Sequence, residues 1–323
     1  MHGARATGQT GPRHTPGIRR VRRVCGACVL ILGMMGATAS AQSAHLLIVV
    51  GLAGDPEHGE LFKKWGATLA STSEKLGVAP ERVVQLVGQT TRAQVEKAFD
   101  TLAKTVAPDD SVFVVLIGHG SFDGRTAKFN LAGPDMAPAD FAALLRRLPS
   151  KHVAFVNTAS ASGPFLEELK GPGRAIVTAT RSGSEQFATL FGGYFVDAFG
   201  ADAADADKNG RVSLLEAFEY AKREVARAYE REGLLATEHA LIEDPEKMAT
   251  MLSLGSTRDA ATPPADPHLR ALYTERRELE RRVEALKLLK GGMDPQRYLK
   301  ELESVATELA MKNREIRAAE AKP

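Results

Sequence analysis

Two short segments of the chain carry side chains that could do covalent chemistry. Residues 118–121 read Gly-His-Gly-Ser, and residues 157–163 read Asn-Thr-Ala-Ser-Ala-Ser-Gly. An imidazole can act as a general base toward a hydroxyl nucleophile. A glycine beside it lets a backbone N–H approach a substrate carbonyl, as an oxyanion site requires. His119, Ser160 and Gly120 are therefore the candidate catalytic residues.

A second candidate site is the acidic loop at residues 205–216. Its sequence, Asp-Ala-Asp-Lys-Asn-Gly-Arg-Val-Ser-Leu-Leu-Glu, has the ligand spacing of an EF-hand calcium loop, with glycine at the sixth position. A single loop of this kind predicts a structural Ca²⁺ ion rather than a paired sensor. A helix cap is the alternative interpretation, because residues 213–216 also form a capping box. The expected ligands are Asp205, Asp207, Asn209, the Arg211 carbonyl, Ser213 and Glu216.

The elements that must position these residues are apolar runs alternating with helical patterns. Such uninterrupted apolar strands predict a parallel sheet buried on both faces, so the expected fold class is α/β, a three-layer sandwich with a mostly parallel sheet. In these sheets the ligand crevice lies beyond the carboxyl ends of the strands, where both catalytic segments fall. Strands are expected at 45–51, 83–87, 111–117, 152–156 and 174–179, and helices at 60–76, 91–105 and 137–148.

The two catalytic segments resemble those of the caspase and legumain-like cysteine peptidases. In that family one apolar strand ends in His-Gly and a later one ends in Ala-Cys-x-Ser-Gly, where residues 159–163 here read Ala-Ser-Ala-Ser-Gly. The resemblance covers roughly residues 45–230. It implies a caspase-like sheet, a catalytic role for His119, an oxyanion role for the Gly120 amide, and Ser160 in place of the nucleophilic cysteine.

A serine at that position changes the expected chemistry. A thiol ionises far more readily than a hydroxyl, so a serine needs an oriented general base, usually a histidine held by a carboxylate. The nearest carboxylate in the sequence is that of Asp123. We expect an inactive domain that binds a peptide or protein ligand as a calcium-stabilised scaffold. The alternative is an active peptidase or related hydrolase with a Ser160/His119 dyad.

Two other features bear on the site. A second His-Gly pair, His58-Gly59, follows the first strand and could wall a substrate crevice, although an exposed loop histidine is the commoner situation. The α/β-hydrolase class is disfavoured, because its nucleophilic serine lies between glycines and precedes its histidine in the chain. Here His119 precedes Ser160.

Residues 1–41 have the three parts of a secretory signal peptide. Four arginines between residues 19 and 23 precede an apolar run at 24–35, and small residues follow up to Ala41. The apolar run is shorter than a membrane span. We therefore expect cleavage before Gln42, export to the periplasm or the medium, and no stable membrane span afterwards. An uncleaved anchor is the alternative.

Cysteine and charge counts exclude several classes of protein. Cys25 and Cys28 are the only cysteines, so residues 42–323 hold no thiol nucleophile, disulfide or thiolate metal site. The formal charge is +2, but six of the 42 basic residues lie in residues 1–41, which leaves 36 against 40 acidic ones, or −4. A nucleic-acid partner therefore has no compositional support.

The remaining chain divides by composition into three parts. The caspase/legumain-like domain is expected at 42–255, followed by a proline-rich linker at 256–267. Residues 268–323 have apolar positions at three-, four- and seven-residue steps on both sides of a turn near residue 291. They predict a charged helical hairpin or coiled coil, available for self-association.

Overall fold

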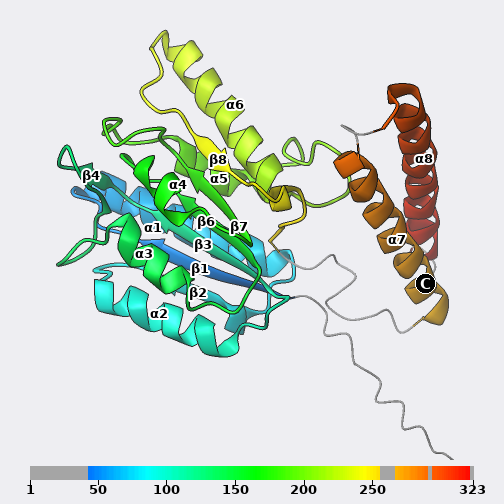
Figure 1. Cartoon of the computed structure of the whole chain (residues 1–323), viewed down its shortest axis with the longest axis horizontal. Coiled ribbons are helices and arrows are strands. Elements are labelled where there is room, and N and C mark those ends of the chain that lie inside the picture. Colours follow the sequence, from blue (N-terminus) through cyan, green and yellow to red (C-terminus); the bar gives the residue numbers. More distant parts are fainter. Residues whose placement is uncertain (1–42, 255–265, 290–292, 321–323) are drawn as a thin grey trace, which may run out of the picture. The chain divides into compact units, whose positions relative to one another are not determined.

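One six-stranded sheet forms the centre of the computed structural model, which describes residues 43–254, 266–289 and 293–320. The strands in chain order are β1 (Ala44–Val50), β2 (Val83–Leu86), β3 (Ser111–Ile117), β4 (Gly120–Phe122), β5 (Ala127–Phe129), β6 (His152–Asn157), β7 (Arg174–Thr178) and β8 (Leu241–Glu243). The order in the sheet is β2-β1-β3-β6-β7-β8, and every neighbouring pair is parallel except β7 with β8 (Figure 1). Strands β4 and β5 form a separate antiparallel pair.

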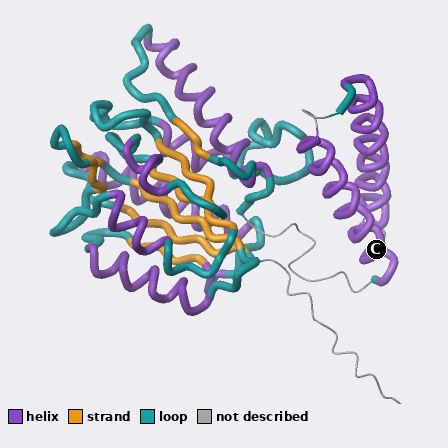
Figure 2. The backbone as a smooth tube through the Cα atoms, in the orientation of Figure 1, coloured by secondary structure: helices purple, strands orange, loops and turns teal. Residues whose placement is uncertain are grey.

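Helices cover both faces of the sheet, which confirms the predicted α/β fold of three layers (Figure 2). They are α1 (Pro56–Lys75), α2 (Arg92–Thr105), α3 (Pro138–Leu145), α4 (Pro164–Leu169), α5 (Phe191–Ala198) and α6 (Leu214–Glu232), with 3₁₀ turns at Pro80–Arg82 and Met248–Thr250. Helices α1, α5 and α6 contribute to one apolar core, and α2, α3 and α4 contribute to the other.

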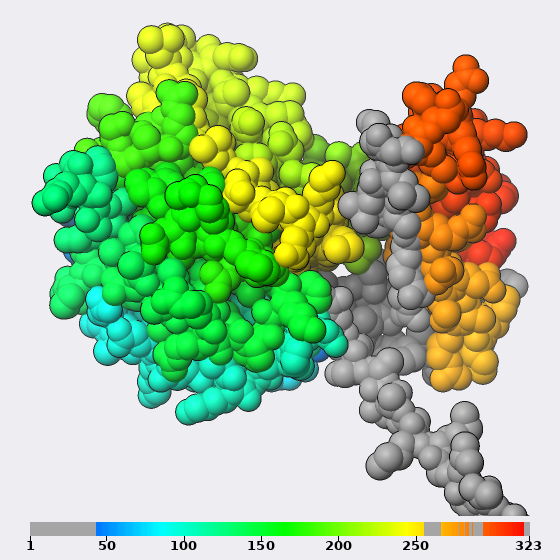
Figure 3. All heavy atoms as spheres, viewed as in Figure 1, coloured from blue at the N-terminus to red at the C-terminus, as the bar shows by residue number. Residues whose placement is uncertain are grey.

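The central strands feed both cores because successive side chains point to opposite faces. In β1, Leu46, Ile48 and Val50 join the core under α1, whereas Leu47 and Val49 join the core under α2. Such two-sided burial explains why β1 and β3 are continuous apolar runs in the sequence. In the space-filling view, later parts of the chain cover nearly all of the blue N-terminal strand (Figure 3).

Helix α1 begins four residues earlier than expected. Asp55 is its N-cap, and its carboxylate accepts a hydrogen bond from the His58 N–H at 2.9 Å. Pro56 occupies the first turn, where a missing N–H costs nothing. The first turn contains exposed charged residues, so a search for periodic apolar positions does not detect where the helix starts. His58 therefore lies on a helix, and its placement in a loop was wrong.

The segment after β3 is also more regular than expected. The sequence predicted an irregular loop from residue 118 to the helix at 137, but it contains the β4–β5 hairpin. These strands are three residues long, too short for an alternating pattern to be visible. Helices α4 and α5, of six and eight residues, were not predicted because they are too short to show a clear helical periodicity.

The C-terminal part forms two helices, α7 (Pro267–Leu289) and α8 (Pro295–Glu320), as the hairpin prediction required. Helix α8 begins as expected, with the Asp294 carboxylate accepting the Arg297 N–H at 2.9 Å. Pro267 is the first residue of α7, so the helix begins at the last residue of the predicted linker, one residue earlier than expected. Self-association stays a prediction. The predicted apolar positions of the two helices pack together in two clusters containing Leu269, Leu272, Leu279, Val283, Leu286, Tyr298, Leu302, Val305, Leu309 and Ile316.

Some predictions concern segments outside the described residues. They include the signal peptide at 1–41 with both cysteines, and most of the linker at 256–267. Among the described helices, none is long and apolar enough to cross a membrane.

The aromatic packing under α3 gives a test of the fold. Phe155 of β6 is fully buried and packs against Phe141 and Phe165, with ring centroids 5.4 Å and 6.5 Å away. We predict that Phe155→Ala lowers the free energy of unfolding by about 3–5 kcal/mol, because it removes a core ring and leaves a cavity. Chemical denaturation measures the change. The control Phe187→Ala, at a side chain 71% exposed, should change stability by no more than about 0.5 kcal/mol.

Candidate functional site

The topology brings both predicted catalytic segments to one edge of the sheet. Strand β3 pairs with β1 on one side and with β6 on the other, all parallel. His119 follows β3, and Ser160 follows β6 in a tight turn. The carboxyl ends of the three strands therefore supply the candidate site, where α/β sheets place their ligands.

The backbone of Gly120 and the side chain of Ser160 are hydrogen bonded in both directions. The Gly120 N–H donates to the Ser160 Oγ at 3.2 Å, and the Ser160 hydroxyl donates to the Gly120 carbonyl at 3.1 Å. Ser160 is 2% exposed. The sequence thus placed Gly120 and Ser160 together correctly, but the hydroxyl is hydrogen bonded to the backbone of residue 120 rather than to the imidazole of residue 119.

His119 instead faces helix α1. Its ring centroid lies 4.8 Å from that of His58 and 5.1 Å from that of Phe62, both in edge-on arrangements. Burial is the main reason that the pKa of His119 is lowered, and the charge of His58 lowers it further. Asp55 and a hydrogen bond to the Ala53 backbone act in the opposite direction. The fold therefore favours a neutral imidazole at His119.

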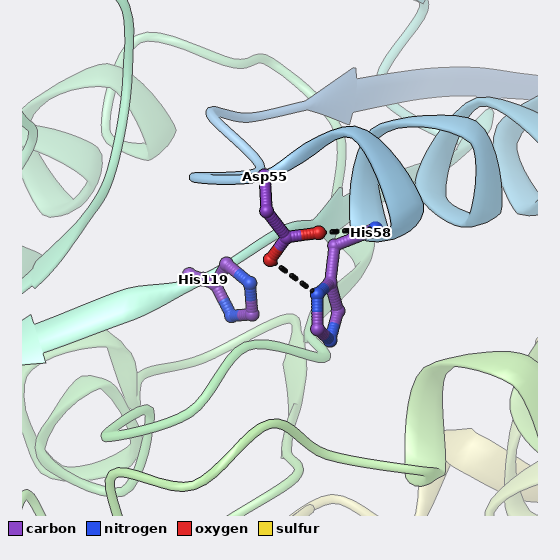
Figure 4. Close-up of side chains that lie close together, drawn as sticks. All are labelled: Asp55, His58 and His119. Atoms are coloured by element: carbon purple, nitrogen blue, oxygen red, sulfur yellow. Dashed lines mark hydrogen bonds and ion pairs between the residues drawn. The ribbon is translucent and has the colours of Figure 1, made fainter.

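An acid–base pair at the start of α1 completes this cluster. The Asp55 carboxylate contacts the His58 Nδ1 at 2.7 Å through one oxygen, while the other oxygen accepts the N–H of the same residue. Figure 4 shows the two imidazole rings lying next to each other with the carboxylate of Asp55 beside both. One potential ligand atom from each of Asp55, His58 and His119 lies within 4.8 Å of the other two. Sequence reasoning left Asp55 out and ranked His58 as an exposed loop residue.

The carboxylate expected to orient His119 does not do so. One oxygen of Asp123 accepts the backbone N–H groups of Arg125 and Thr126, at 2.9 and 2.8 Å. These bonds belong to the exposed β4–β5 turn, and they lower the pKa of Asp123. The carboxylate near His119 is that of Asp55, which lies 64 residues earlier in the chain but follows β1, the strand that pairs with β3. Only the β1–β3 pairing could have revealed it.

The turn that carries Ser160 is held by other polar groups. Ala161 has a left-handed backbone, with φ of 53°, and its N–H donates to the Glu185 carbonyl at 2.7 Å. The Ser162 hydroxyl lies 3.1 Å from that of Thr180, and Thr180 also accepts the Gly163 N–H. A non-glycine residue at positive φ is strained, and it persists where surrounding bonds fix the conformation. The position of Ser160 is therefore rigidly defined.

The acidic loop adopts a compact turn at the start of α6. Asp205 accepts the N–H groups of Asn209 and Gly210, and Gly210 has a φ of 84°, as the tight turn at that loop position requires. Potential ligand oxygens of Asp205, Asp207 and Glu216 lie within 4.8 Å of one another. Burial is the main reason that the pKa of Asp205 is raised, and the charges of Asp207 and Glu216 raise it further.

The capping interpretation of this loop is confirmed. One Glu216 oxygen accepts the N–H and the hydroxyl of Ser213, and the Ser213 hydroxyl accepts the Glu216 N–H. The other Glu216 oxygen accepts the Ala206 N–H at 3.0 Å. The Asn209 side-chain oxygen accepts the Arg211 N–H. The loop thus serves as a helix cap by itself, and three of the expected calcium ligands gather beside that cap.

The contact between Gly120 and Ser160 allows a direct test. A Cβ atom at residue 120 would lie 2.2 Å from the Ser160 carbonyl oxygen, a backbone atom that cannot rotate away. We predict that Gly120→Ala lowers the free energy of unfolding by about 1–3 kcal/mol.

Gly59→Ala is the matched control. Its Cβ would meet nothing closer than 3.8 Å, and alanine is the better helix former, so stability should hold or rise by up to about 1 kcal/mol. Equal effects of the two substitutions in chemical denaturation would contradict the close contact.

Comparison with models of known protein families identifies the family. A model of the Peptidase C13 family, which is legumain- and caspase-like, matches residues 78–243, or 166 of the 323 residues. The matched range includes both candidate catalytic segments and the loop at 205–216, whereas Asp55 and His58 precede it. No match is found among curated proteins.

Proposed function

The chain belongs to the Peptidase C13 family, and we propose that it has lost thiol-dependent peptidase activity and serves as a binding or scaffold module for a peptide or protein. The observation that carries this proposal is the absence of cysteine from residues 29–323, which include the whole matched range. Peptidases that resemble this chain use a cysteine nucleophile, and no residue of the matched range can supply a thiolate.

The surroundings of Ser160 support the proposal. We assign Ser160 to the position of the family's nucleophile because residues 159–163 match its motif at every defined position except that one. A serine needs a base that accepts its proton, and this hydroxyl donates to the Gly120 carbonyl. The same hydroxyl accepts a hydrogen bond from the Gly120 N–H, the group to which the family resemblance assigns binding of the oxyanion. Both bonds must break before Ser160 could attack a substrate.

The second candidate function is hydrolysis by a Ser160/His119 dyad. One observation favours it: a carboxylate–imidazole pair, Asp55 with His58, lies directly against His119. A carboxylate near a base stabilises the protonated form of that base, and the charge of Asp55 partly opposes the burial that lowers the pKa of His119. The proposal and this alternative make opposite predictions for the unmodified protein.

Hydrolysis of a fluorogenic peptide library by the purified protein separates the two functions. We predict no turnover by the unmodified protein, and turnover by Ser160→Cys that is lost in the double variant Ser160→Cys/His119→Ala. The thiol is a few per cent ionised near neutral pH and needs no oriented carboxylate. Turnover by the unmodified protein that disappears in both Ser160→Ala and His119→Ala would establish the serine hydrolase instead.

We also propose that the loop at 205–216 binds one structural Ca²⁺ ion. Support comes from its twelve-residue spacing and from the clustered oxygens of Asp205, Asp207 and Glu216. A bound cation would offset the repulsion among these three clustered carboxylates. The Arg211 carbonyl, Asn209 and Ser213 would complete the ligand set.

Thermal unfolding with and without calcium tests this site. Because an ion that binds only the folded state stabilises it, a Ca²⁺ concentration about 100 times Kd should add about 2.7 kcal/mol and raise the melting temperature. Asp205→Ala should abolish the calcium-dependent rise, whereas Asp202→Ala, an acidic residue just outside the loop, should retain it. Equal melting temperatures in calcium and in chelator would count against the site.

A further inference from the structure

The proposed function does not explain why Asp55, His58 and His119 lie together. Two imidazoles and one carboxylate converge from the β1–α1 connection and from the end of β3. The helix cap accounts for Asp55 and for the backbone of His58. It does not require either imidazole ring, and it gives no reason for His119 to face the same carboxylate.

The two histidines are placed as metal ligands usually are. Phe62, 4% exposed, packs against both rings, with centroids 5.6 Å from His58 and 5.1 Å from His119. The Asp55 carboxylate lies 2.7 Å from the His58 Nδ1. An apolar side chain packed against both rings limits their orientations and the access of solvent, as the shell around a metal site does.

We infer that Asp55, His58 and His119 bind one divalent transition-metal ion of the Zn²⁺ class. Imidazole nitrogen with a carboxylate oxygen suits zinc and its neighbours, whereas Ca²⁺ and Mg²⁺ prefer oxygen ligands throughout. The ligand atoms now lie within 4.8 Å of one another. Bonds of about 2.0–2.2 Å to a shared ion require them to be somewhat closer. Binding would replace the hydrogen bond between Asp55 and the His58 Nδ1 with bonds to the ion, while the other Asp55 oxygen keeps its cap on α1.

The inference goes beyond the proposed function and does not depend on it. Three protein ligands would leave at least one position of a four-coordinate ion open. An open position is where a metal binds water or a ligand group such as a peptide carbonyl or carboxylate. His119 would then be a metal ligand, and it could not also act as a general base.

Cobalt binding to the purified, chelator-treated protein provides the test. Co²⁺ reports its coordination by visible absorption and takes the same ligands as Zn²⁺. We predict saturable binding of one Co²⁺ per chain, displaced by Zn²⁺. His58→Gln and His119→Gln should each weaken binding at least about tenfold. Losing a residue that only hydrogen bonds to a metal ligand already lowers metal affinity by about that factor. Asp55→Asn should weaken it too while preserving the helix, because asparagine is an equally good N-cap.

Two controls exclude nonspecific binding. His239→Gln removes the ring of another imidazole–carboxylate pair, with Glu185 at 2.8 Å, and should leave the affinity unchanged. Asp205→Ala should leave it unchanged as well, which separates this site from the acidic loop. The inference fails if no saturable binding of one ion occurs, if His119→Gln binds normally, or if only Asp205→Ala abolishes binding. None of these readouts depends on peptidase activity, so the proposed function is tested separately.

Discussion

The reciprocal hydrogen bonding between Gly120 and Ser160 is the constraint on which the site depends. It joins the connections that leave β3 and β6, and it requires residue 120 to have no side chain. The imidazole of the neighbouring residue, His119, packs against α1 beside His58 and Phe62. The bonds thus divide the sheet edge into a buried hydroxyl region at Ser160 and a partly exposed region where His119, His58 and Asp55 meet.

The division separates roles that one catalytic centre would combine. In a serine hydrolase the hydroxyl, the imidazole and the carboxylate form one chain of hydrogen bonds. Here the hydroxyl bonds to the backbone, and the carboxylate bonds to His58 rather than to the histidine of the predicted dyad. This arrangement agrees with the proposal that the domain keeps the architecture of its family without its thiol chemistry.

The fold could be predicted further than the site. Long apolar strands and capped helices have local signals, so the β1, β3 and α2 assignments needed only the sequence. The cluster around His119 depends on which strands are neighbours, and pairing of β1 with β3 has no local signal. Asp55 was missed because a capping aspartate looks like any other charged residue at a helix start. Asp123 was chosen for its closeness in sequence, but its own turn uses the carboxylate.

The arrangement of strand lengths has a consequence for how copies of this domain meet. Both outer strands are short, four residues in β2 and three in β8, whereas β1 and β3, with seven each, are interior. Unpaired backbone at a long sheet edge is a template for aggregation. Little such backbone is left open here, so continuous sheets across two molecules are disfavoured, and assembly would have to rely on side chains.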